Sequence, residues 1–252
     1  MSSYDTFAKQ FDASMGESGD YFHKTQIDPA IYEIIGNPKG KTIYDIGCGN
    51  GYMARYFANK GAKIFASDAS ASLIEIAKNK SSNLDITYSV RDATDFSGFE
   101  KSQCDTVVMN MVIHYIKDLN SLCKGIASVL KTNGIFAYST NHFFRPMYPL
   151  SEWVTGTVGK KETLFIKTTG YLKQEKRIVV SGWDNKTKLT LYNHPLNELV
   201  NTMAAYGLYT NRIIEPESNG FAKDFSTKLQ NSHHIPTFII IGTQKCSTIN
   251  NI

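Results

Sequence analysis

The chain of 252 residues is long enough for one α/β domain with an elaboration or for two small domains. Its formal net charge of +4 is mild, and its 27 lysine and arginine residues are scattered without a long basic run. A basic face for nucleic acid is therefore not expected, and the short runs at 159–161 and 173–177 indicate solvated surface.

Cysteine usage and hydropathy indicate a reducing, aqueous environment. The four cysteines show neither CxxC nor Cys/His metal spacing, so we expect free thiols and no metal site. The N-terminal segment is polar and acidic, unlike a signal peptide, and the longest apolar runs fall far short of the roughly 20 residues that a membrane helix needs. These features predict a cytoplasmic protein with no membrane partner.

The first thirty residues carry helical patterns. Phe7 and Phe11 recur at helical spacing, and Asp28 is the expected N-terminal cap of a further helix. We expect residues 1–30 to form a helical cap and residues 31–252 to form the main domain.

Strand and helix patterns then alternate along the chain. Strands are expected at 41–47, 62–68, 85–90, 104–110 and 135–140, and helices at 51–61, 70–80 and 118–131. This alternation predicts an α/β fold whose mostly parallel sheet has helices on both faces.

The pattern changes between about 142 and 192. This segment is rich in aromatic residues, threonine and lysine, and its period-2 alternation predicts a small antiparallel β insert. Its aromatic side chains either pack together or form the floor of a pocket for a flat or apolar substrate; they are Phe143, Phe144, Tyr148, Trp153, Tyr171 and Trp183. A helix at 195–207 and two strands follow the insert.

The segment "YDIGCGNG" at 44–51 places three alternate glycines, beginning at Gly47, between a strand and a helix. Such a turn suits a phosphate, a dinucleotide or an adenosyl group. The phosphate-loop pattern is absent, and a dinucleotide turn requires glycine where Tyr52 stands. Asp45 would repel a pyrophosphate but attract an ammonium or sulfonium cation. S-adenosylmethionine carries both cations.

Two further acids follow the second and third strands. Asp68 lies roughly twenty residues beyond the glycines, where an acceptor for a ribose diol is expected, and this position suits NAD equally well. Asp92 can accept a hydrogen bond from an adenine amine, while Ala93 offers its backbone N–H to the ring. Cys48 and Ala69 lie within the same turns and complete this candidate set.

At these residues the sequence resembles the class I S-adenosylmethionine-dependent methyltransferases. The resemblance is to the small-molecule branch that includes ubiquinone and menaquinone biosynthetic enzymes. The similar motifs are, in chain order, "YDIGCGNG", "SDASASLIEIAK", "RDATDF" and "VVMNMVIHYIKDL". The likeness extends to "GDYFHKTQIDPAI" and to the last helix and strands, so it covers nearly the whole chain except the insert.

The resemblance implies a Rossmann-like, doubly wound sheet of seven strands in the order 3-2-1-4-5-7-6, with one antiparallel strand near its edge. It implies S-adenosylmethionine as the cofactor. Asp45, Gly47 and Gly49 would line its methionine side, while Asn110 and the backbone of Met111 would lie beside the sulfonium. Its adenosine would be held by Asp68, Asp92 and Ala93.

Four more residues are candidates by position. Tyr21 and His23 precede the first sheet strand, where the cap can fold over the cofactor, and an aromatic ring near a sulfonium gains cation–π energy of order 1–2 kcal/mol. His114 and His142 follow the fourth and fifth strands, where open α/β sheets bind ligands. Each histidine is either a catalytic base or a structural residue.

The predicted function is methyl transfer to an oxygen, nitrogen or carbon atom of a small molecule, by a monomer or homodimer. The substrate is aromatic or apolar in this interpretation. The [DN]PP[YF] signature is absent at 110–113, which disfavours DNA or glutamine N-methylation. The alternatives are an RNA-modifying methyltransferase, an NAD-dependent oxidoreductase and a non-catalytic S-adenosylmethionine-binding regulator.

Overall fold

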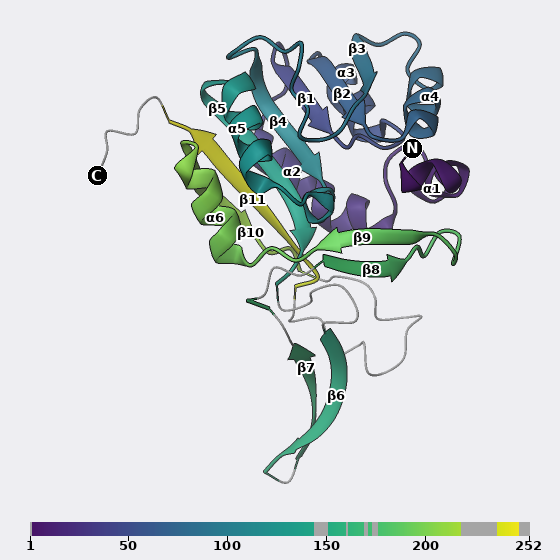
Figure 1. Ribbon diagram of the computed structural model, residues 1–252, viewed down its shortest axis with the longest axis vertical. Coiled ribbons are helices and arrows are strands. Elements are labelled where there is room, and N and C mark those ends of the chain that lie inside the picture. Colours follow the sequence, from purple (N-terminus) through teal and green to yellow (C-terminus); the bar gives the residue numbers. More distant parts are fainter. Residues whose placement is uncertain are drawn as a thin grey trace.

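The computed structural model shows a central sheet covered by helices on both faces (Figure 1). It describes residues 2–143, 151–159, 161–168, 171–172, 176–217 and 236–246. The N-terminal part contains η1 (Ser3–Thr6), α1 (Ala8–Met15), η2 (His23–Ile27) and α2 (Asp28–Ile35). The alternating part contains β1 (Thr42–Ile46), α3 (Tyr52–Asn59), β2 (Lys63–Asp68), α4 (Ala71–Asn79), β3 (Ile86–Val90), β4 (Cys104–Asn110), η3 (Ile113–Tyr115), α5 (Leu119–Val129) and β5 (Leu130–Asn141). The remaining elements are β6 (Ser151–Val158), β7 (Lys161–Thr168), β8 (Lys176–Val180), β9 (Lys188–Tyr192), α6 (Leu196–Ala205), β10 (Leu208–Ile214) and β11 (Phe238–Lys245).

The seven-stranded sheet has the order β10-β11-β5-β4-β1-β2-β3. Its labels differ from the expected numbers because β6 to β9 lie outside this sheet; counted among the sheet strands alone, the order is 3-2-1-4-5-7-6. Strand β11 runs antiparallel to both β5 and β10, whereas the neighbours from β5 to β3 are parallel. The Rossmann-like, mostly parallel fold is therefore confirmed.

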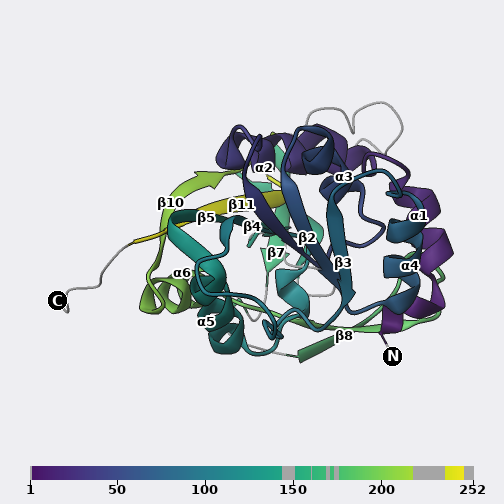
Figure 2. The same cartoon turned by 90° about the horizontal axis from the view of Figure 1, so that it is seen from above.

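Alternation along each strand divides the core into two layers. In β4, the buried Val107 and Met109 belong to the layer with α5 and α6, whereas Val108 belongs to the layer with α2 and α3. Figure 2 shows these two pairs of helices on opposite sides of the sheet. Because both faces are covered, the three successive residues Val107, Val108 and Met109 are all apolar, which is the pattern of a buried parallel strand.

The N-terminal segment folds against the edge of the sheet that carries α4. Phe7 is fully buried, and the Asp5 carboxylate accepts hydrogen bonds from the Ser70 hydroxyl (2.6 Å) and the Ser72 amide (3.1 Å) at the start of α4. The Asn50 side chain donates to Asp12 of α1 over 2.8 Å. These contacts fix η1 and α1 beside the ends of β1 and β2.

The insert forms two antiparallel pairs, β6–β7 and β8–β9. Figure 1 shows β6–β7 extending away from the sheet and β8–β9 crossing near its lower end. Phe144 and Tyr148 lie outside the described residues. Within the described part of the chain, no helix combines the length and apolar character that a membrane span requires.

A glycine in α5 provides a test of packing on one face of the sheet. Gly125→Ala should lower the free energy of unfolding by about 1–3 kcal/mol. A Cβ at position 125 would collide with the ring of Phe96, which packs against the core. A loss of stability is unusual for this substitution, because alanine normally stabilises a helix interior relative to glycine by roughly 1 kcal/mol.

Urea denaturation of the purified variants measures this effect. Gly182→Ala is the control, because its added Cβ would meet nothing within 4 Å. Equal stability of the two variants would contradict the close contact between α5 and Phe96.

Candidate active site

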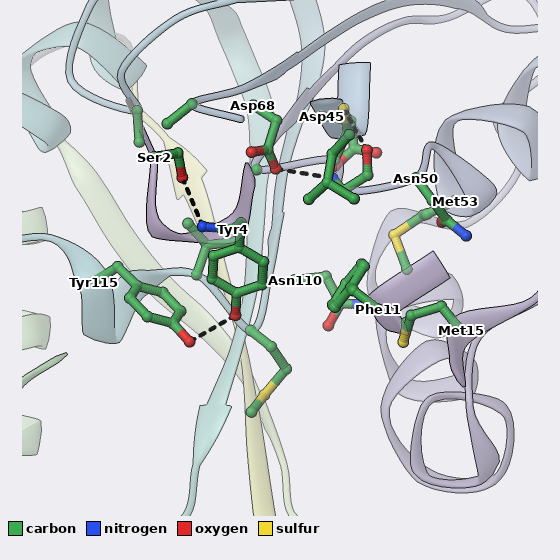
Figure 3. A pocket seen from close by; sticks show the side chains of 18 of the residues that line it. Ser2, Tyr4, Phe11, Met15, Asp45, Asn50, Met53, Asp68, Asn110 and Tyr115 are labelled. Carbon is green, nitrogen blue, oxygen red and sulfur yellow. Dashed lines mark hydrogen bonds between the residues drawn. The ribbon is translucent and has the colours of Figure 1, made fainter. Parts of the chain in front are cut away.

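A cavity of about 510 Å³ lies at the carboxyl ends of β1, β2 and β4 (Figure 3). Its size is within the range of sites that enclose small molecules and cofactors. The glycine turn and the strand ends form one side, and the N-terminal segment and the β8–β9 pair form the other. This is the edge of an open α/β sheet at which ligands bind.

The glycine turn brings backbone close to the cavity. The amides of Gly47 and Cys48 both donate to the Ser67 carbonyl, over 2.7 and 2.9 Å. Gly47 has φ = +71°, and a Cβ there would collide with Val112. Glycine is therefore required at this position both by the left-handed backbone and by the close approach of the chain after β4.

Asp68 terminates β2 and faces the glycine turn. Its carboxylate accepts hydrogen bonds from the amides of Gly49 (3.0 Å) and Ser70 (2.8 Å). Burial is the main reason that its pKa is raised, and these backbone amides oppose that shift. The carboxylate lines the cavity and keeps lone pairs for further donors, as a ribose acceptor requires.

Asp45 is the residue whose surroundings are hardest to explain without a ligand. It is 2% exposed, and its Oδ2 has no hydrogen-bond partner among the described residues. Burial, followed by the nearby carboxylates of Asp68 and Asp28, raises its pKa to about 8. A cation in the cavity would stabilise the ionised form, so this residue fits a ligand with an ammonium or sulfonium group.

A buried network fixes the end of β4. Tyr52 and Asn110 each donate to Oδ1 of Asp28 over 3.0 Å, and the Asn110 carbonyl accepts from the Ser139 hydroxyl over 2.6 Å. The Met111 amide donates to the same hydroxyl over 2.8 Å, and Met111 has φ = +57°. The network therefore holds Asn110 and the strained Met111 backbone rigidly at the cavity wall.

Asp28 differs from its expected role as a helix cap. The residue before α2 is Ile27, and no side chain caps this helix. Asp28 is instead buried, with a pKa raised to about 6, mainly because of burial. Sequence reasoning missed the role of Asp28, because a polar residue near a helix start normally indicates a cap. It also missed Tyr52 and Ser139.

Asp92, Ala93, Ala69 and Cys48 all line the cavity, as their positions in the turns predict. Asp92 is exposed, and its Oδ1 accepts from both the amide and the hydroxyl of Thr94, over 2.8 and 2.5 Å. Cys48 is buried, which raises the pKa of its thiol. The structure thus brings these four residues together with Asp45 and Asp68.

The two aromatic candidates of the N-terminal cap, Tyr21 and His23, differ in their position relative to the cavity. His23 lines the cavity, and its Nδ1 lies 2.8 Å from Oδ1 of Asp20. Tyr21 is 47% exposed and does not line the cavity. Phe22, which follows it, points to the cavity instead, because adjacent residues of a helical turn face different directions.

Aromatic side chains close the other side of the cavity. The hydroxyls of Tyr4 and Tyr115 share a hydrogen bond of 2.7 Å (Figure 3). Trp183, at the tip of the β8–β9 pair, stacks on Phe7 with centroids 5.4 Å apart and donates to the Ser14 hydroxyl over 3.0 Å. The N-terminal segment and the insert are therefore joined to each other on this side of the cavity and cover it.

The two candidate histidines have different surroundings. His114 lines the cavity, and no hydrogen bond reaches either ring nitrogen from the described residues. Burial, followed by the charge of His194, lowers its pKa to about 4. His142 does not line this cavity; it is 2% exposed and its Nε2 lies 2.7 Å from Oε1 of Glu215. The described residues contain no cluster suited to a metal ion.

Comparison with known proteins agrees with this geometry. Residues 44–138 match the family described as "Methyltransferase domain". A "Ubiquinone biosynthesis O-methyltransferase" of Xanthomonas axonopodis pv. citri is 28% identical over 119 residues, which are 45% of this chain and 50% of that protein. The protein of the same name from Coxiella burnetii is 30% identical over 104 residues, 40% of this chain and 44% of its own length. The chain thus spans half or less of the curated relatives it matches.

Solved structures share the fold. A "putative S-adenosylmethionine dependent methyltransferase" from Listeria monocytogenes has a TM-score of 0.70 at 23% identity, covering 86% of this chain and 96% of its own. An S-adenosylmethionine dependent methyltransferase from Mesorhizobium loti has a TM-score of 0.71 at 20% identity, with the same coverage.

The fold and the acid-lined glycine turn define an adenosyl-binding α/β protein. With the family match, residues 44–138 are a methyltransferase domain, and the chain has the fold of S-adenosylmethionine-dependent methyltransferases.

The buried Asp45 should destabilise the ligand-free protein at high pH. Its folded pKa of about 8 lies above the ordinary value of 3.8, so the folded state retains a proton that the unfolded state loses. The free energy of unfolding should therefore fall as pH rises from about 4 to about 8. Asp45→Asn carries no such proton and should exceed the wild type by on the order of 1 kcal/mol or more at the upper end.

Denaturation curves of both proteins across this pH range check the difference. Saturating S-adenosylmethionine should remove the higher stability of Asp45→Asn, because the cation of this ligand would stabilise the ionised Asp45. A difference in the free energy of unfolding between the two proteins that stays constant with pH would contradict an unpaired carboxyl at Asp45.

Asp68→Ala should weaken the binding of S-adenosylmethionine by more than about tenfold, because the cavity loses a buried acceptor. Asp95→Ala is the control: Asp95 receives the Ser97 amide in an exposed turn and does not line the cavity. Calorimetric titration gives both affinities, and melting curves verify folding. Equal affinities would rule out the ribose assignment.

Proposed function

We propose that the protein transfers a methyl group from S-adenosylmethionine to a hydroxyl oxygen of a neutral, largely apolar aromatic molecule. The observation that carries the proposal is one cavity that joins an acid-lined glycine turn to an aromatic wall with an unpartnered imidazole. The chain covers only part of its named relatives, so activity and substrate rest on this site.

The glycine-turn side would hold the cofactor. Asp45 would face its cationic amino-acid portion, Asp68 its ribose, and Asp92 with Ala93 its adenine. When bound, this cofactor supplies an electrophilic methyl group on a cationic sulfur. Such a cation would stabilise the ionised forms of the buried Asp45 and Asp68 carboxyl groups, which a pyrophosphate would destabilise.

The chain contributes mainly position and exclusion of water. Asn110 and the Met111 backbone cannot shift without breaking the buried network around Asp28. Trp183, which stacks on Phe7, lines the side opposite the glycine turn. A rigid, shielded site of this kind lowers the barrier by orienting the reactants and removing their solvent shells.

The charges that line the cavity favour a neutral substrate. Four aspartates line it, namely Asp20, Asp45, Asp68 and Asp92. Among the described lining residues, Arg91 carries the one guanidinium or ammonium group, and it donates to the carbonyls of Asp95 and Ser97. A carboxylated or phosphorylated substrate would therefore meet four aspartates against one guanidinium.

Two observations support oxygen as the accepting atom. The curated relatives of Xanthomonas and Coxiella are named O-methyltransferases. In this chain, His114 lines the cavity and carries no hydrogen bond, so a substrate hydroxyl can donate to it. Its low pKa keeps the ring neutral and able to accept at physiological pH.

Labelled S-adenosylmethionine tests the proposal. Catechol should be methylated with a kcat/KM about tenfold or more above that of 3,4-dihydroxybenzoate, because the added carboxylate is repelled by the lining acids. Mass spectrometry locates the transferred methyl group, and the Asp68→Ala protein is the control for background transfer. Preference for the carboxylate, or no methylation of a panel of neutral phenols and catechols, would refute the proposed substrate class.

A further inference from the structure

A second, smaller cavity of about 50 Å³ shares His114 with the main cavity. It lies between η3, the end of β5, β9 and the start of α6. His114 is the one described residue that lines both cavities. Its imidazole therefore forms part of the wall that separates them.

Two buried polar atoms indicate that this small cavity is a water site. Nδ1 of His114 and Nδ2 of Asn141 are buried and have no hydrogen-bond partner among the described residues. Leaving each atom unsatisfied would cost about 1–3 kcal/mol. Both residues line the small cavity, which is large enough for water. Water bridging these atoms satisfies them.

The same cavity leads toward solvent through a second histidine. His142 lines it and is almost fully buried, while Nε2 of this ring lies 2.7 Å from the Glu215 carboxylate. The Glu215 side chain is 52% exposed. A proton that reaches His142 can therefore pass to a carboxylate at the protein surface.

Other titratable groups lie near His114, and two of them, His194 and Tyr115, have partners of their own. His194 faces both the ring and the small cavity, but its Nε2 bonds to the Ile116 carbonyl over 2.7 Å and its Nδ1 lies 3.3 Å from Glu198. The Tyr115 ring is adjacent, and its hydroxyl bonds to Tyr4. Arg177 and Tyr192 also line the small cavity.

We propose that His114, water in the small cavity and the His142–Glu215 pair form the route by which the hydroxyl proton leaves the substrate during methyl transfer. This route rests on the proposed O-methylation. An imidazole suits the position because it can accept a proton on one ring nitrogen and donate from the other. The groups around the His114 ring then determine the direction in which the proton moves.

The substrate oxygen forms a bond to the methyl carbon, and the carbon–sulfur bond breaks with its electron pair remaining on sulfur as a thioether. The hydroxyl proton moves to a ring nitrogen of His114. The other ring nitrogen releases a proton to the water, which passes one to His142, and Glu215 delivers it to solvent, so that His114 is neutral again.

Two acceptors of different acidity test the route. At about pH 8, catechol is largely protonated, whereas the more acidic 4-nitrocatechol is largely a monoanion, whose ionised oxygen has no proton to lose. His114→Gln should lower kcat for catechol by about tenfold or more and kcat for 4-nitrocatechol by less than about threefold. Glu215→Gln should lower kcat for catechol severalfold, and Glu217→Gln, an exposed acid nearby, should not.

Equal losses on both acceptors in His114→Gln, with unchanged affinity for S-adenosylmethionine, would make His114 a packing residue and overturn the route. No methylation of either acceptor by the wild type would overturn the proposed function, and the route with it. If His114→Gln does not fold, the Glu215→Gln and Glu217→Gln pair decides: equal kcat on catechol overturns the route.

A crystal structure of the wild-type protein gives a readout independent of activity. At a resolution that shows solvent, ordered water should lie within hydrogen-bond distance of Nδ1 of His114 and Nδ2 of Asn141. A dry cavity would overturn the route, because the proton would have no carrier between the two histidines.

Discussion

The burial of Asp45 beside two other carboxylates is the constraint on which the site depends. Asp28, Asp45 and Asp68 all have raised pKa values, chiefly because burial penalises their charge. Backbone and side-chain donors reach Asp68 and Asp28, but Oδ2 of Asp45 has no partner in the described part of the chain. The fold tolerates this cost at the place where a cationic cofactor would offset it.

The rest of the architecture maintains this concentration of charge. Parallel strands bring the ends of β1, β2 and β4 to one edge of the sheet, and the Asp28–Tyr52–Asn110 network makes that edge rigid. The N-terminal segment and the β8–β9 pair then shield it, through contacts such as Tyr4 with Tyr115. Shielding raises the cost of an unpaired carboxylate and equally raises the gain from a bound cation.

Local sequence signals predicted which residues line the glycine-turn side of the cavity better than they predicted the remainder. The strand–glycine–helix turn and Asp68 are recognised from short-range sequence patterns, which do not depend on tertiary contacts. Asp28 was wrongly expected to cap a helix, because its partners Tyr52 and Asn110 are 24 and 82 positions away. The contact of Trp183 with Phe7 has no sequence signal, since it joins the insert to the distant N-terminal segment.

The sequence by itself determined the order of strands and helices, the two-sided core and the glycine turn that lines the cavity, because these depend on local periodicity and on backbone freedom at Gly47. Only the tertiary structure decided which polar residues share a cavity. It separated Tyr21 from His23, left Asp45 without a partner, and placed His114 between a large and a small cavity. Burial and long-range contact create these properties, and neither is encoded in the spacing of neighbouring residues.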